Sequence, residues 1–186
     1  MMDRDKMEEG IRLFLDGLGE HVVGPEIVKT PRRVARAWAD DLVSGYGVDP
    51  AAELTYAPAP TGGGPVIVKD IRFSSVCVHH LLPFSGLAQV AYLPAARLAG
   101  LSKIGRVIDA LSRRLQIQEH LTAGIASAIE KALAPRAVLV VLDAEHTCMT
   151  LRGVRKEGSR LVTYAARGLW ADDSAARREI MDIFEA

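Results

Sequence analysis

Val66-Ile67-Val68-Lys69-Asp70-Ile71-Arg72-Phe73 is β-branched and partly alternating, which predicts a strand leading directly into Ser75-Val76-Cys77-Val78-His79-His80. The second stretch holds one of the two cysteines of the chain and two of its five histidines within four residues. The other cysteine, Cys148, also lies near a histidine, in Glu145-His146-Thr147-Cys148. We hypothesise that the two clusters meet to hold a catalytic zinc ion; the alternative is two ordinary buried thiols, since two-Cys patterns also arise by chance.

The length and the net charge of the chain limit the classes of function that it can have. A chain of 186 residues fits one domain, or one domain with an extension. Its 23 Lys and Arg balance 23 Asp and Glu, which gives no global attraction to nucleic acid or to an anionic membrane, so any anion needs a local patch. No apolar run approaches the roughly 18 residues of a membrane span, and the start lacks the apolar core of a signal peptide. We therefore expect a cytoplasmic protein.

The first third of the chain predicts helices and then a loop. Apolar residues at mostly helical spacing predict a helix from Met7 to Gly19. Thr30, followed by Pro31 at the first helical position, predicts the N-cap of a second helix that runs to Gly45. Prolines and glycines dominate from residue 49 to 64, which indicates a loop or boundary.

The remainder predicts strands and helices in alternation. We expect a strand at 87–93, paired to the first by a turn around residues 83–86, and two helices, one capped by Ser102 and one spanning about 118–133. A continuous apolar strand at 137–143, an alternating strand at 160–167 and a closing helix at 175–184 follow. This order indicates an α+β fold with a mostly antiparallel sheet, and both Cys-His clusters fall at strand ends.

Catalytic zinc keeps three protein ligands and one open position. Cys77, Cys148 and one of His79 and His80 would supply three, because neighbouring residues on a strand point to opposite faces. The other histidine is then free for proton transfer. His146 would stand beside the metal as a general acid if its segment is extended. For His21 and His120 we expect an ordinary structural role.

Basic residues form a second constellation. Ser102, Lys103 and Arg106 fall in the first turns of one predicted helix, where free N–H groups favour an anion, and Arg152 and Arg155 follow Cys148. Together they could clamp a polyphosphate; the alternative is a solvated basic face.

Gln118-Glu119 is a third constellation. A carboxylate can accept two parallel N–H bonds from the amidine edge of a guanine, so Glu119 could select that base. The alternative is an exposed pair on a helix.

Five motifs in order resemble the GTP cyclohydrolase I family, from about Thr30 to near the C-terminus. They are Thr30-Pro31-Arg32-Arg33-Val34-Ala35, Cys77-Val78-His79-His80-Leu81-Leu82-Pro83-Phe84, Gly100-Leu101-Ser102-Lys103-Ile104, Arg113-Arg114-Leu115-Gln116-Ile117-Gln118-Glu119, and His146-Thr147-Cys148-Met149 with Arg152-Gly153-Val154-Arg155.

The resemblance implies a tunnelling fold, an antiparallel sheet with two long helices on one side whose subunits join into an oligomeric barrel. Residues 1–60 would be an N-terminal helical region and linker, and residues 61–186 the catalytic domain. Family members are commonly homodecamers of two pentameric rings with active sites between subunits. The implied activity is zinc-dependent conversion of GTP and water to 7,8-dihydroneopterin triphosphate and formate, the first step of folate and pterin synthesis.

The resemblance also implies a role for each matching residue. Zinc ligands would be Cys77, His80 and Cys148, and His79 and His146 would transfer protons. Substrate contacts would come from Glu119, helped by Gln118, on the guanine, and from Ser102, Lys103, Arg106 and Arg152 on the ribose and triphosphate.

Val78 departs from the family pattern, which normally has a glutamate between the cysteine and the histidine pair. Valine can neither accept a hydrogen bond nor balance a positive charge. Two alternatives follow: a specialised paralogue that acts on a related purine nucleotide or stops at a ring-opened intermediate, and a non-catalytic assembly that binds a pterin or nucleotide.

Overall fold

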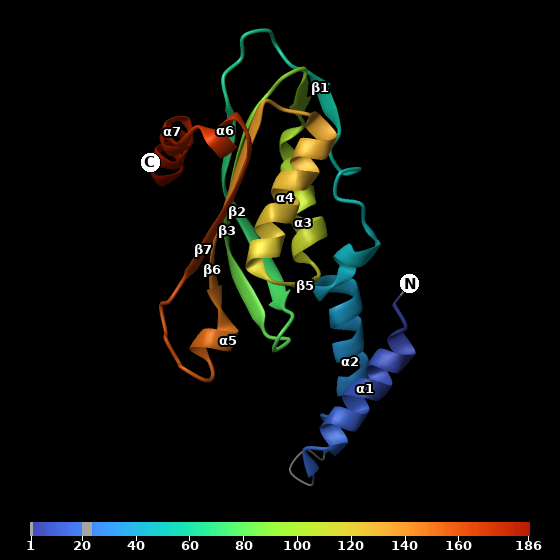
Figure 1. Cartoon of the computed structure of the whole chain (residues 1–186). Helices are drawn as coiled ribbons and strands as arrows, with labels where there is room; N and C mark the ends of the chain where they lie inside the picture. The colour runs from blue at the N-terminus through green and yellow to red at the C-terminus, as the bar shows by residue number, and fades with distance from the viewer. Residues whose placement is uncertain (1, 20–23) are drawn as a thin grey trace.

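A five-stranded curled sheet forms the centre of the computed structural model, which describes residues 2–19 and 24–186 (Figure 1). The strand order is β5-β2-β3-β6-β7. The strands are β2 (Val66–Cys77), β3 (Pro83–Leu93), β5 (Leu115–Gln116), β6 (Ala137–His146) and β7 (Leu161–Gly168). The four long strands pair antiparallel, and the short β5 pairs parallel to β2. The predicted α+β class is confirmed.

Helices cover both faces of this sheet (Figure 1). Alternate residues of β6 belong to different cores, because successive side chains of a strand point to opposite faces. The core shared with α3 (Leu101–Ser112) and α4 (Gln118–Leu133) includes Val138, Val140, Leu142 and Ala144. The core shared with α6 (Leu169–Asp172) and α7 (Ser174–Glu185) includes Leu139, Val141, Trp170 and Ile180.

One extra residue in β2 forms a β-bulge. Val68 and Ile71 are three residues apart, yet their partners on β3 are two apart. Asp70, inside the bulge, has a left-handed φ of 57°, and its N–H donates to Oε1 of Gln89 at 2.8 Å. The bulge shifts the alternation of β2, so Cys77 faces the same core as Val68 and Ile71.

The N-terminal helices lie beyond one end of the sheet (Figure 1). They are α1 (Arg4–Asp16) and α2 (Thr30–Ala37), which continues into the π-helical turn η2 (Trp38–Leu42) and the 3₁₀ turn η3 (Ser44–Gly47). The α-helix predicted to reach Gly45 therefore ends at Ala37. Thr30 is its first residue rather than its N-cap, which is Lys29.

The other differences between the predicted and the observed elements lie in short strand pairings, turns and helix caps. The loop predicted at 49–64 contains β1 (Tyr56–Pro58), which pairs with β4 (Arg97–Ala99). The turn predicted at 83–86 is wrong: residues 83–86 begin β3, and the chain reverses at 78–82. Ser102 does not cap α3, whose N-cap is Gly100. His21 lies outside the described residues. Across residues 2–19 and 24–186, each helix is too short or too polar to cross a membrane.

Candidate metal centre and active site

Three side chains converge at one end of the sheet. Cys77 ends β2, His80 lies in the following turn, and Cys148 lies in the four-residue helix α5 (Thr147–Thr150) after β6. Their ligand atoms all lie within 4.8 Å of one another, and among the described residues they are the group suited to a metal ion. Sγ of Cys77 is 3.9 Å from Nδ1 of His80 and 4.0 Å from Sγ of Cys148.

The donor set fits zinc. A tetrahedral ion with Zn–S bonds of about 2.3 Å and Zn–N bonds of about 2.0 Å separates its ligand atoms by roughly 3.5–3.8 Å. The observed separations of 3.9 and 4.0 Å are close to that geometry. Two thiolates and an imidazole are soft and intermediate ligands, which favour zinc over magnesium or calcium. Three protein ligands leave the fourth position for water or substrate.

The turn after β2 positions Cys77 and His80. The N–H of Leu81 donates to the carbonyl oxygen of Cys77 at 2.9 Å, and the N–H of Cys77 donates to that of Leu82 at 2.9 Å. Leu81 takes the left-handed φ of 55° that closes this turn. On the other side, the Thr147 hydroxyl donates to the carbonyl oxygen of Pro83 at 2.5 Å, which ties α5 to the start of β3.

His79 lies in the same turn and is exposed. Its Nδ1 is also 3.9 Å from Sγ of Cys77, although the cluster of three ligands contains His80. The expectation that the two histidines point to opposite faces of a strand is wrong, because residues 78–80 form a turn. The turn nevertheless leaves one histidine in the cluster and the other beside it.

His146 is held by contacts on two sides. It ends β6, where it pairs with Phe84 of β3, and the two rings stack with centroids 4.3 Å apart at an interplanar angle of 7°. Its Nε2 lies 2.8 Å from Oε1 of Gln118. Burial lowers the pKa of His146 below its ordinary value, and the Glu119 carboxylate opposes that shift. The segment after His146 is helical, so the two-residue spacing to Cys148 does not place both on one extended face.

Gln118 and Glu119 begin α4 and have opposite surroundings. Gln118 is 1 % exposed, and its amide is hydrogen-bonded inside the protein. Glu119 is exposed in the first turn and close enough to His146 to affect its pKa. Among the described residues the Glu119 carboxylate has no hydrogen-bond or ion-pair partner, so it is available to a ligand close to His146.

The predicted basic residues divide into two groups. Arg152 opposes the rise in the pKa of Cys148, which puts its charge near the metal cluster. Lys103 lies in the first turn of α3, whereas the metal end of the sheet adjoins the last turn of that helix, since Gln116 pairs with Cys77. At 1.5 Å per residue, Lys103 lies about 14 Å along the axis from Ser112. One chain does not bring both groups together.

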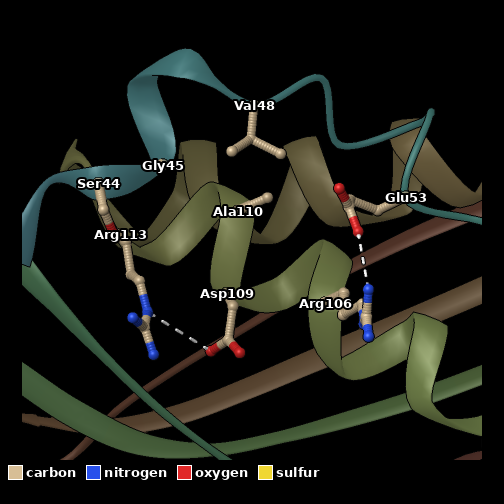
Figure 2. Close-up of a pocket in the computed structure, with 8 residues that line it drawn as sticks. All are labelled: Ser44, Gly45, Val48, Glu53, Arg106, Asp109, Ala110 and Arg113. Atoms are coloured by element: carbon tan, nitrogen blue, oxygen red, sulfur yellow. Dashed lines mark ion pairs between the residues drawn. The ribbon is translucent and has the colours of Figure 1, made fainter. Parts of the chain in front are cut away.

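Arg106 borders a cavity of about 310 Å³ between α3 and the segment from η3 to Glu53 (Figure 2). Its guanidinium lies 3.8 Å from the Glu53 carboxylate, and Arg113 lies 3.9 Å from Asp109 along the same helix. Both arginines are largely exposed, so these ion pairs contribute little to stability. A polyphosphate could replace Glu53 as the partner of Arg106. Ser102 is exposed next to Lys103.

Sequence patterns missed the partners that hold His146. Local patterns assign no role to Phe84, which stacks on His146, or to Thr163 of β7, which contacts Gln118 and so supports His146 only indirectly. Oγ1 of Thr163 lies 3.1 Å from Nε2 of Gln118 and 2.7 Å from Oγ1 of Thr122. Only strand pairing and the docking of α4 bring these residues together, and neither is visible in a local pattern.

Known proteins similar to this chain share one description. A family model described as GTP cyclohydrolase I matches residues 7–185. A Streptococcus agalactiae protein named GTP cyclohydrolase 1 is 45 % identical over 186 residues, 100 % of this chain and 99 % of that protein. A Streptococcus thermophilus protein of the same name is 42 % identical over 184 residues, 98 % of each chain.

One solved structure gives a weaker match. The crystal structure of the archaeosine synthase QueF-Like in the apo form aligns with a TM-score of 0.49 at 19 % identity, covering 58 % of this chain and 97 % of that chain. The fold description above rests on the strand order and register of the chain itself.

We expect Cys148→Ala to abolish stoichiometric zinc binding, because two protein ligands hold zinc far less tightly than three. Metal content of the purified protein, measured by mass spectrometry, checks this. Met149→Ala, the neighbouring residue in α5, is the matched control and should keep its zinc. Stoichiometric zinc in Cys148→Ala would remove Cys148 from the ligand set.

Zinc affinity should rise with pH. Burial raises the pKa of the Cys148 thiol, and the nearby Cys77 raises it further, so at neutral pH the metal-free protein carries a proton that zinc must displace. Each thiol proton released gives about a tenfold gain in affinity per pH unit below the thiol pKa. Competition with a chelator between about pH 6 and pH 8, on either side of neutrality, measures how the zinc affinity changes with pH. A flat profile would contradict a raised pKa of the Cys148 thiol.

Proposed function

Because the chain belongs to the GTP cyclohydrolase I family and is an enzyme of that kind, we propose that it converts GTP and water to 7,8-dihydroneopterin triphosphate and formate with zinc held by Cys77, His80 and Cys148. The observation that carries this proposal is the cluster of two cysteines and one histidine with His146 fixed nearby. The reaction would be the first step of folate and pterin synthesis, in the cytoplasm. No nucleic-acid or membrane partner is proposed.

The zinc site supplies the hydrolytic chemistry, and two histidines supply proton transfer. A bound zinc ion would act as a Lewis acid and lower the pKa of a coordinated water to about 7. His146, whose pKa burial lowers, is neutral at neutral pH and can accept a proton. His79, exposed beside the ligands, exchanges protons with solvent and substrate.

The guanine is proposed to lie against Glu119. Its carboxylate is exposed in the first turn of α4 and near His146. There it can accept two parallel N–H bonds from the amidine edge of the base. Gln118 precedes it in the chain, but its amide is buried and hydrogen-bonded inside the protein.

The triphosphate is proposed to lie between two subunits. Arg152 lies near Cys148, whereas Ser102, Lys103 and Arg106 lie on the first turns of α3, away from the metal end of the sheet. A second copy of the chain would have to supply one of the two groups. We propose a homodecamer of two pentameric rings, in which the sheets join as a barrel in a tunnelling fold.

The outer edge of the sheet supports such an assembly. In the described part of the chain β7 is one of the two edge strands of the sheet, and Val162 and Tyr164 on it are 60 % and 58 % exposed. An unpaired apolar edge strand is a pairing site for another chain. We propose that residues 61–186 form the catalytic domain and residues 1–60 an N-terminal helical region and linker.

Val78 supports a second candidate function. It directly follows Cys77 and is 40 % exposed, and its N–H donates to the carbonyl oxygen of Gln116 at 3.1 Å, which fixes its backbone beside a proposed metal ligand. An apolar residue there favours a paralogue that acts on a related purine nucleotide or stops at a ring-opened intermediate. A non-catalytic pterin- or nucleotide-binding assembly is the remaining alternative, and it predicts no turnover.

We expect the zinc-loaded protein to release formate from GTP and to form a pterin that fluoresces after oxidation. His146→Ala should lower turnover by about 10²- to 10⁴-fold with zinc retained, the usual contribution of a positioned general acid or base. His120→Ala, an exposed histidine of α4, is the control. Mass analysis separates the pterin from a ring-opened product. Absence of both formate and pterin with zinc bound would exclude the proposed reaction.

We expect Val78→Glu to raise turnover about tenfold, the usual scale for a residue that supports a metal site from its second layer. The position is exposed enough for the longer side chain. Val78→Gln, equal in length but neutral, separates the effect of charge from that of polarity. Steady-state turnover of the three proteins at equal zinc content is the measurement. Equal rates would mean that the missing carboxylate does not limit the reaction.

A further inference from the structure

A closed hydrogen-bond network lies beneath His146, at the junction of β6, β7 and α4. Its central member is the Gln118 side chain, which is 1 % exposed. Nε2 of Gln118 lies 3.1 Å from the carbonyl oxygen of Leu142, 2.8 Å from that of Leu161 and 3.1 Å from Oγ1 of Thr163. Oε1 of Gln118 lies 2.8 Å from Nε2 of His146.

The surroundings fix the orientation of this amide. Two of the neighbours, the carbonyl oxygens of Leu142 and Leu161, can only accept hydrogen bonds. A flipped Gln118 would place Oε1 against both of them, so acceptor would face acceptor and both hydrogen bonds from the amide would be lost. The NH₂ group therefore faces the strands and Oε1 faces His146.

The hydroxyl bonds are consistent with this orientation. The Thr122 hydroxyl donates to the backbone carbonyl oxygen of Gln118 at 2.7 Å, so it can only accept in its 2.7 Å contact with Thr163. The Thr163 hydroxyl then donates to Thr122 and accepts from Nε2 of Gln118. The two NH₂ protons of Gln118 are shared among three acceptors, and each hydroxyl proton has an acceptor of its own.

The orientation of Gln118 determines the tautomer of His146. Oε1 only accepts, so the Nε2 atom of His146 must carry a proton and donate it. In the neutral ring Nδ1 is then the nitrogen that can take up a proton. The stacked Phe84 ring holds the imidazole plane, so the direction of Nδ1 is fixed as well.

We infer that Gln118 is a positioning residue that holds His146 as its Nε2–H tautomer, with Nδ1 as the atom that exchanges protons with substrate. This inference rests on the proposed function for the proton-transfer role of His146. It assigns Gln118 a role other than the guanine contact implied by the sequence. A guanine contact would require Gln118 to exchange buried hydrogen bonds for the base, whereas Glu119 is already exposed.

The first experiment reads the tautomer directly. Magic-angle-spinning NMR of the zinc-loaded, full-length protein with ¹⁵N-labelled histidine rings distinguishes protonated from unprotonated ring nitrogens, and loss of a signal in His146→Ala assigns the residue. We expect the proton of neutral His146 on Nε2, and a mixture of tautomers in Gln118→Met. A wild-type proton on Nδ1, or an unchanged single tautomer in Gln118→Met, would overturn the inference.

The second experiment separates positioning from substrate binding. Gln118→Met should lower kcat for GTP about 10- to 100-fold, part of the contribution of a positioned acid or base, with KM changed less than about threefold. A guanine contact predicts instead a KM raised tenfold or more with kcat retained, and that result would overturn the inference. Ser112→Ala, which changes a buried hydroxyl without a hydrogen-bond partner among the described residues, is the control and should keep wild-type kcat.

The two experiments distinguish failure of the inference from failure of the proposed function. Absence of GTP turnover in the wild-type protein would exclude the proposed reaction, yet the NMR spectrum would still report whether Gln118 holds the tautomer. If the zinc content and the assembly size of Gln118→Met equal those of the wild-type protein, a folding defect is excluded. If Gln118→Met does not fold, the wild-type tautomer alone decides the inference.

Discussion

The β-bulge at Asp70 is the constraint on which the rest of the site depends. Before it, Val66 and Val68 face the core beneath α3 and α4; after it, Ile71, Phe73 and Cys77 do. Without the extra residue, a strand beginning with Val66 and Val68 on this face would turn Cys77 to the opposite face, away from Cys148. Gln89 stabilises the bulge by accepting from the Asp70 N–H at 2.8 Å and donating to its carboxylate at 3.1 Å.

The same register places His146, the proposed proton-transfer residue, near the proposed metal ligands. Phe84 of β3 pairs with His146 of β6, and both side chains point to the face covered by α4. That face presents Gln118, from the buried start of the helix, to the Nε2 atom of His146. A buried polar network of this kind is stable only if every member has a hydrogen-bond partner. The hydrogen bonds that stabilise the contact between β6, β7 and α4 therefore also orient the imidazole of His146. Stability and chemistry therefore depend on the same hydrogen bonds.

Much of this arrangement follows from the sequence, and the exceptions have physical causes. Periodicity and β-branched runs predict the long strands and α4, and the two Cys-His clusters predict a metal group that the strand ends bring together. The turn after β2 escaped prediction because it closes through a left-handed leucine, Leu81, and uses neither glycine nor asparagine. The burial of Gln118 escaped prediction because a Gln-Glu pair at a helix start looks exposed, and this burial arises from strands that follow it in the chain.

The position of the basic residues argues that the folded chain is only part of a catalytic site. Arg106 lies 3.8 Å from Glu53 at the cavity between α3 and the segment from η3 to Glu53, and this ion pair contributes little to stability because the guanidinium is largely exposed (Figure 2). A triphosphate carries more negative charge than one carboxylate, so it can displace Glu53 at small cost. The proposed metal ligands lie near the other end of α3, so in the proposed function a substrate that contacts both groups spans two copies of the chain. In the proposed assembly the exposed apolar edge of β7 is the surface on which another copy would pair.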